Sequence, residues 1–159
     1  MKRIILVRHA KSDWPANTED FDRPLAESGF RDARKMSSYL KEQGVSIHQF
    51  VTSPALRTVT TCQLFDDIYD IKYEKAEKLY HPSEENFLSV IYDLHDSVDT
   101  VALFSHNNGI SNFANTFTDQ IMHMPTCGVA AFDIECQSWS EFEGANKKLA
   151  FFYEPKKLK

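Results

Sequence analysis

Short apolar runs along the chain alternate with longer stretches whose apolar residues recur every three or four positions. The run Ile4-Ile5-Leu6-Val7 is apolar at every position, which is typical of a strand buried on both faces of a sheet. Further strands are predicted at 47–52, 71–74, 100–105, 129–134 and 148–153, and helices at 26–43, 56–70, 84–94 and 110–117. This alternation predicts an α/β fold, a three-layer α/β/α sandwich with a mostly parallel central sheet and the two late strands at its edge.

Composition limits the classes of protein to consider. The 159 residues, 42% hydrophobic and 26% charged, predict a single domain over 1–159 that needs neither metal nor disulfide to fold. Three cysteines without CxxC spacing are expected to be reduced thiols. The net charge of -5 argues against a nucleic-acid partner, which would require a broad basic face. No apolar run reaches the length of a membrane span or signal peptide, so a cytoplasmic location and no membrane partner are expected.

Basic and histidine side chains follow three of the predicted strands at the point where each strand ends. Arg8 and His9 follow the first strand, Arg57 lies in the first turn of the helix after the second, and His106 follows the strand at 100–105. The carboxyl ends of parallel strands meet at one edge of a sheet, where ligands bind. Ser53, followed by proline, is expected to cap the helix of Arg57. We therefore expect an anion site at this edge, supported by a helix N-terminus.

These residue types together suit phosphoryl transfer. An imidazole can attack phosphorus when one ring nitrogen carries a lone pair and the other is held by a hydrogen bond, and His9 is placed for this role. Fixed cationic donors must surround the oxygens of the transferred group. Arg8, Arg57 and His106 are the candidates for that task.

Other polar residues have weaker signals. Ser12 and Asn107 are candidate hydrogen-bond donors to the phosphate, although capping or turn roles explain them equally well. The remaining histidines have no partners at ligand spacing and are interpreted as surface or interface residues: His48, His81, His95 and His123.

Three segments, in this order and spacing, resemble the histidine phosphatase superfamily, which has the phosphoglycerate mutase-like fold. They are Leu6-Val7-Arg8-His9-Ala10-Lys11, Ser53-Pro54-Ala55-Leu56-Arg57 with Thr58 and Thr61, and Phe104-Ser105-His106-Asn107. Further segments are similar to the short, SixA-like branch of phosphohistidine phosphatases: Phe21-Asp22-Arg23-Pro24-Leu25, Leu79-Tyr80 and Met124-Pro125-Thr126-Cys127-Gly128-Val129. The resemblance covers nearly the whole chain.

The resemblance implies a phosphatase that requires no metal and no cofactor. At the matching positions it makes His9 the nucleophile, while Arg8, Arg57 and His106 bind the phosphate and its transition state. Water then hydrolyses the phosphohistidine. The implied partner is a phosphorylated protein side chain or a small phosphorylated substrate.

A general acid is harder to assign. Larger members of the superfamily carry an acidic proton donor after the third strand, where Glu84 and Glu85 are the nearby candidates, and Asp13 lies in the first loop. All three have ordinary structural explanations, as helix-start or solvated loop carboxylates. Weak acid assistance favours a leaving group that departs readily, such as the imidazole of phosphohistidine. The short connections, with about 20 residues between positions 109 and 129, also leave no inserted lid to enclose a metabolite.

Three hypotheses follow from the sequence. The first is a hydrolase of phosphohistidine or of another phosphoprotein or phosphoramidate, and the second is a small-molecule phosphomonoesterase of the same fold. The third is a phosphate-binding module that uses the same cations without turnover. Trapping of a phosphoryl group on His9 would separate the enzymes from the binding module.

Overall fold

The computed structural model describes residues 1–158, and within them the strands form one mixed sheet in the order β3-β2-β4-β1-β5-β6. The strands are β1 (Lys2–Arg8), β2 (Gln49–Thr52), β3 (Tyr73–Lys75), β4 (Thr100–Ser105), β5 (Val129–Ile134) and β6 (Lys147–Tyr153). The first four in sequence pair in parallel, whereas β5 and β6 are antiparallel to their neighbours. The predicted mostly parallel α/β sheet is therefore confirmed.

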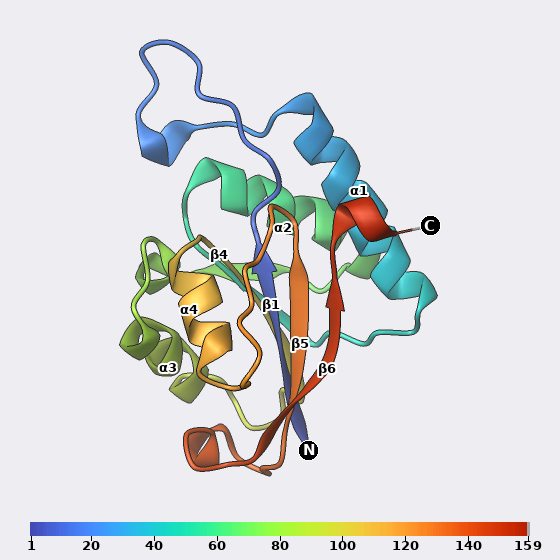
Figure 1. Ribbon diagram of the computed structural model, residues 1–159, viewed down its shortest axis with the longest axis vertical. Coiled ribbons are helices and arrows are strands. Elements are labelled where there is room, and N and C mark those ends of the chain that lie inside the picture. The colour runs from blue at the N-terminus through green and yellow to red at the C-terminus, as the bar shows by residue number, and fades with distance from the viewer. Residues whose placement is uncertain (159) are drawn as a thin grey trace.

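Helices cover both faces of this sheet (Figure 1). The α-helices are α1 (Glu27–Glu42), α2 (Leu56–Tyr69), α3 (Glu84–Tyr92) and α4 (Gly109–Asn115), and the 3-10 helices are η1 (Asp20–Asp22), η2 (Glu77–Leu79), η3 (Trp139–Glu141) and η4 (Pro155–Lys157). The apolar faces of α1 and α2 contribute to one buried cluster, and those of α3 and α4 contribute to another. The result is the three-layer arrangement that the sequence pattern predicts.

Strand β1 separates the two halves of the core. Ile4 and Leu6 belong to the cluster on the α3 and α4 side, and Ile5 and Val7 to the cluster on the α1 and α2 side. All four side chains are fully buried. The continuous apolar run in the sequence is thus explained by burial of alternate residues on opposite faces.

Several element boundaries differ from the prediction. Helix α2 begins at Leu56 with Ala55 as its N-cap and no side-chain capping bond, so the expected capping by Ser53 is wrong. The hydroxyl of Ser53 instead lies 2.7 Å from the ring of His106. The third strand is also shorter than predicted, because residues 71 and 72 are held by the carboxylate of Asp66, which accepts hydrogen bonds from both backbone N–H groups.

Two further predictions concern membranes and cysteines. Over residues 1–158, none of the helices has both the length and the apolar character needed to cross a membrane. Cys62, Cys127 and Cys136 are free thiols and all are buried.

Helix α1 packs closely on the chain that leaves β1, and this contact can be tested. A Cβ atom at Gly29 would lie 2.1 Å from the carbonyl oxygen of Lys11. Glycine-to-alanine changes inside helices normally stabilise a protein, but we expect Gly29→Ala to lower the free energy of unfolding by at least about 1 kcal/mol through overpacking. Gly144→Ala is the control, since a Cβ there has no neighbour within 4 Å. Denaturant unfolding measures both, and a stabilised Gly29→Ala variant would contradict the packing described.

Candidate active site

A cavity opens at the carboxyl ends of the parallel strands. The loop that leaves β1 arches beyond this edge of the sheet (Figure 1). It is lined by Arg8, His9, Lys11, Ser12, Asp20, Arg23, Arg57, His81, His106, Asn107 and Thr126. The lining includes four Arg or Lys side chains and one carboxylate. Such an excess of positive charge favours an anionic ligand.

His9 is buried and its ring is fixed by the backbone. Its Nδ1 atom lies 2.8 Å from the carbonyl oxygen of Ala10, and because a carbonyl can only accept, Nδ1 carries the proton and Nε2 carries the lone pair. Burial lowers the pKa of His9 to about 4, and the nearby charges of Arg57 and Arg8 act in the same direction. The ring is therefore neutral at pH 7 and has an available nucleophilic nitrogen.

His106 lies beside His9, with 5.3 Å between the ring centroids. Its Nε2 atom is 2.7 Å from the hydroxyl of Ser53 and 3.2 Å from that of Thr58. Burial, followed by the charges of His9 and Arg57, lowers the pKa of His106 to about 2. Its buried Nδ1 atom has no hydrogen-bond partner among residues 1–158, which leaves this atom available to a ligand.

The two arginines reach the cavity from different elements. Arg57 lies in the first turn of α2 and is only 3% exposed. Arg8 ends β1 and donates from Nη1 to the carbonyl of Met124 at 3.0 Å. The buried Nε atoms of both guanidinium groups have no hydrogen-bond partner within the described part of the chain. Buried donors of this kind are normally satisfied, so both are candidates to bind an anion.

Asp20, which the sequence reasoning missed, anchors this arrangement. Its backbone carbonyl and its carboxylate accept hydrogen bonds from Arg57 at 2.6 and 3.1 Å. The same carboxylate accepts from Arg23 at 3.2 Å and from the hydroxyl of Tyr80 at 2.6 Å. Partial burial opposes ionisation, but these hydrogen bonds hold the pKa of Asp20 far below its ordinary value. The carboxylate is therefore ionised and orients Arg57 at the cavity wall.

Thr61 connects the two segments that carry His9 and Arg57. Its hydroxyl donates to the carbonyl of Arg57 at 2.8 Å and accepts the backbone N–H of Ala10 at 3.0 Å. One buried side chain thus fixes the residue after His9 relative to the first turn of α2.

The weaker candidates are divided by the structure. Ser12 and Asn107 line the cavity, but both are already engaged: the hydroxyl of Ser12 accepts from Arg23 at 2.8 Å, and the amide of Asn107 donates to the carbonyl of Met124 at 3.3 Å. The carboxylates of Glu84, Glu85 and Asp13 do not line this cavity among the described residues.

His81 is a surface residue, as the sequence predicts, but it also lines the cavity. Its side chain is 64% exposed, but it lines the cavity, and its ring centroid lies 6.0 Å from that of His106. Its Nε2 atom is 3.7 Å from the carboxylate of Asp20. The sequence signal was its position between β3 and α3, directly after the Leu79-Tyr80 segment.

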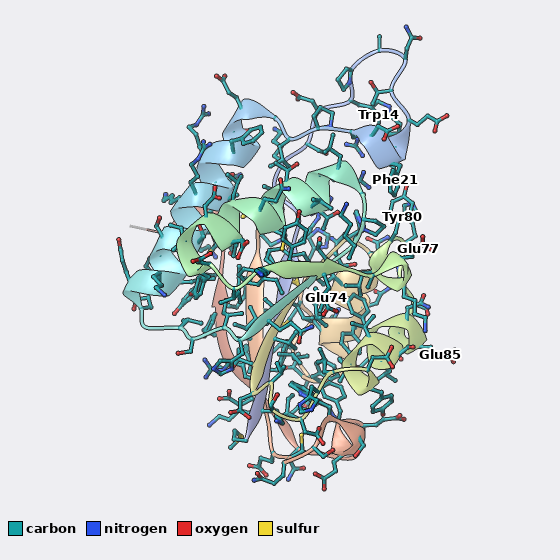
Figure 2. The ribbon with its side chains drawn as sticks, turned by 180° about the vertical axis from the view of Figure 1, so that it is seen from behind. Trp14, Phe21, Glu74, Glu77, Tyr80 and Glu85 are labelled. Atoms are coloured by element: carbon teal, nitrogen blue, oxygen red, sulfur yellow. The ribbon has the colours of Figure 1, made fainter. Side chains whose placement is uncertain are left out.

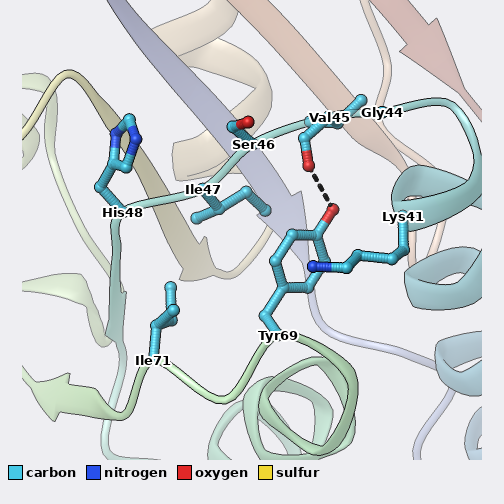
Figure 3. A pocket seen from close by; sticks show the side chains of 8 residues that line it. All are labelled: Lys41, Gly44, Val45, Ser46, Ile47, His48, Tyr69 and Ile71. Carbon is cyan, nitrogen blue, oxygen red and sulfur yellow. Dashed lines mark hydrogen bonds between the residues drawn. The ribbon is translucent and has the colours of Figure 1, made fainter.

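A second cavity lies away from these groups (Figure 3). It is lined by residues 41, 44–48, 69 and 71, and Lys41 lies over the ring of Tyr69, whose hydroxyl donates to the carbonyl of Val45 at 2.8 Å. It holds no arginine and no carboxylate. Among residues 1–158, no group of three or more His, Cys, Asp or Glu side chains could hold a metal ion.

Comparison with known proteins relates this chain to a family. Residues 4–81 match the family model described as the histidine phosphatase superfamily (branch 1). The SixA protein of Agrobacterium tumefaciens is 25% identical, with a TM-score of 0.83 over 97% of this chain and 98% of that one. The amino-terminal half of the chain thus matches the histidine phosphatase superfamily, and the whole chain is similar in structure to SixA.

Other similar proteins match nearly the whole chain. The protein histidine phosphatase SixA, solved with tungstate, is 21% identical with a TM-score of 0.85, covering 99% of each chain. An uncharacterized protein of Mycobacterium tuberculosis is 27% identical over 161 residues, covering 94% of this chain and 100% of that protein. The match to this superfamily and the likeness to SixA support a phosphatase.

The network around Asp20 predicts a pH-dependent stability for this protein. A carboxyl group whose pKa is lowered in the folded state contributes stability above its unfolded pKa and loses it as the pH falls toward the folded value. Asp20→Asn should therefore lower the melting temperature at pH 7, and this difference should shrink below about pH 4. Thermal melts of both proteins from pH 7 to pH 3 measure it. A difference that stays constant over this range would show that the charge of Asp20 does not stabilise the fold.

Proposed function

We propose that this protein is a metal-independent phosphatase that forms a phosphohistidine intermediate on His9. The observation that carries the proposal is the hydrogen bond from Nδ1 of His9 to the carbonyl of Ala10, at 2.8 Å. It leaves the lone pair of Nε2 available in a cavity lined by Arg8, Arg57 and His106. This is the combination that attack on a phosphoryl group requires.

The reaction has two balanced steps. In the first, Nε2 of His9 forms a bond to phosphorus, while the bond to the leaving atom breaks and its electron pair goes to that atom, which gains a proton. Arg8, Arg57 and His106 stabilise the negative charge on the equatorial oxygens. In the second, a water oxygen attacks phosphorus, the bond to Nε2 breaks and the electron pair returns to His9. Inorganic phosphate leaves, and the ring is again neutral with Nδ1 bound to Ala10.

The substrate we propose is phosphohistidine or another phosphorylated group on a protein. The 3-10 helix η1 contributes Asp20 to one wall of the cavity, and the segment between α4 and β5 braces its floor through the carbonyl of Met124, which accepts from Arg8 and Asn107. That segment therefore supports the side chains of Arg8 and Asn107 at the site. An open cavity suits a phosphorylated side chain presented by another protein, and imidazole departs readily once protonated.

Two alternatives remain distinguishable by assay. A small-molecule phosphomonoesterase would hydrolyse sugar phosphates faster than a phosphohistidine peptide at equal concentration. A phosphate-binding module would bind inorganic phosphate without forming a labelled protein. We expect a higher kcat/KM for the phosphohistidine peptide than for either glucose 6-phosphate or 3-phosphoglycerate, and the reverse order would overturn the substrate class while leaving the phosphatase intact.

The nucleophile can be tested by trapping. With a radiolabelled phosphoryl donor and a rapid alkaline quench, which preserves phosphohistidine, we expect label on the parent protein and none on His9→Ala, whose turnover should fall to background. His95→Gln is the matched control because His95 is exposed and lies in the turn before β4. Turnover by His9→Ala close to that of the parent would remove His9 from the mechanism.

The role of Arg57 predicts a large effect on the transition state. Arg57→Ala should lower kcat/KM by more than about 30-fold, which corresponds to roughly 2 kcal/mol of transition-state binding. Arg31→Ala, at an exposed position on α1, controls for loss of a positive charge elsewhere. Equal kinetics for the two variants would exclude Arg57 as a ligand of the phosphoryl group.

A further inference from the structure

His81 is held at the mouth of the cavity by the elements around it. The preceding residues are fixed by two hydrogen bonds of 2.6 Å, from the hydroxyl of Ser105 to the carbonyl of Leu79 and from the hydroxyl of Tyr80 to the carboxylate of Asp20. The following residue, Pro82, packs so closely on the start of α4 that a Cβ at Gly109 would lie 2.4 Å from its carbonyl oxygen. The backbone of His81 is in the left-handed region, with φ of 50°. The contacts before and after His81 therefore fix its backbone at the cavity.

The exposed position of His81 at the cavity that also holds His9 suits the geometry of phosphoryl transfer. The attacking and leaving atoms lie on opposite sides of phosphorus, roughly in line. His9 is at the floor of the cavity and 7% exposed, so the leaving atom must face the mouth. Among the histidines that line the cavity, His81 is the exposed one, with 64% of its side chain accessible. A group at this place can reach the leaving atom directly.

Two other acidic groups near the mouth, Asp20 and Tyr80, are committed to other tasks. Asp20 accepts hydrogen bonds from Arg57, Arg23 and Tyr80 and is ionised, so it has no proton to give. The hydroxyl of Tyr80 donates to Asp20, and partial burial together with this carboxylate raises the pKa of Tyr80.

His106 is buried, and its Nε2 atom is engaged by Ser53 and Thr58. His81 makes one long contact, 3.7 Å from Nε2 to Asp20.

We propose that His81 is the general acid of the first step and the general base of the second, an assignment that rests on the proposed function. Protonated His81 gives its proton to the leaving oxygen or nitrogen as the bond to phosphorus breaks. Neutral His81 then takes a proton from the water that attacks the phosphohistidine, which restores the starting protonation state. The assignment extends the substrate class to phosphate monoesters with poor leaving groups, which need a proton to depart.

The test is a series of aryl and alkyl phosphates with His81→Asn, because asparagine tolerates a positive φ better than most residues. With 4-nitrophenyl phosphate, whose leaving group departs without a proton, we expect kcat/KM within about 3-fold of the parent. With phenyl phosphate and an alkyl phosphate we expect a loss of about 100-fold. His95→Gln should be unaffected throughout.

The pH profile supplies a second readout. In the parent, kcat/KM for phenyl phosphate should fall on the alkaline side as the acid deprotonates, and His81→Asn should lack this limb. The groups that face His81 are Asp20, Tyr80 and His106, with Arg57 and Arg23 bound to Asp20 behind them. Asp20 is ionised throughout the alkaline side of the profile. Loss of the alkaline limb in His81→Asn would therefore assign that limb to His81.

The outcomes separate this assignment from the proposed function. Equal losses on all substrates, or none on any, would overturn the role of His81, whereas label trapped on His9 in His81→Asn with 4-nitrophenyl phosphate would leave the proposed function standing. If the parent protein shows neither label nor turnover with any of these phosphates, both proposals fall. Thermal melts of His81→Asn establish that the variant is folded.

Discussion

The register of β1 against β4 is the constraint on which the site depends. Arg8 is paired with Ser105 in this parallel ladder, so the residues that follow, His9 and His106, leave the sheet at the same level. Their ring centroids consequently lie 5.3 Å apart. The pairing of Thr52 with Phe104 acts in the same way on the other side of β4 and brings Ser53 to the ring of His106. A slip of one residue would turn the buried side chains of β1 to the wrong faces, which the two cores forbid.

Burial and charge together explain why the histidines are neutral while the arginines are not. Burial is the largest cause lowering the pKa of both His9 and His106, and the neighbouring guanidinium groups add to it. An arginine cannot respond by losing its proton at ordinary pH. The cations therefore keep the lone pair on Nε2 of His9 and favour any anion that enters. The two guanidinium groups repel each other in the free protein, and an anion bound between them would offset that repulsion.

The strands and the residues at their ends could be predicted from the sequence because each depends on local pattern. The apolar run of β1 and the Arg8-His9 pair at its end are adjacent in the chain, and parallel pairing carries them to the same edge as Arg57 and His106. Asp20 and His81 could not be found this way. Both lie in polar connections without periodicity, and their meeting depends on contacts between segments about 60 residues apart, such as that from Tyr80 to Asp20.

Ser53 shows how a local rule can mislead. Serine before proline ahead of a helix is a common capping pattern, yet its hydroxyl is bound to His106 while the helix begins three residues later. Local capping and a tertiary partner competed for one hydroxyl, and the partner came from β4. Only the paired sheet shows that His106 lies within reach.

Aromatic side chains pack against the loop that follows β1. Figure 2 shows Trp14 and Phe21 on the loop after β1, with Tyr80 beneath Phe21. The rings of Phe21 and Tyr80 pack edge to face at 5.3 Å, and Arg23 lies over the ring of Trp14 at 4.4 Å. These contacts support the segment that contains Asp20. Its two hydrogen bonds orient the guanidinium group of Arg57, whose Nε atom has no hydrogen-bond partner within residues 1–158. The carboxylate thus positions Arg57 without competing with an anionic ligand for Nε, because the atoms it binds and the atom left available lie on different edges of the guanidinium plane.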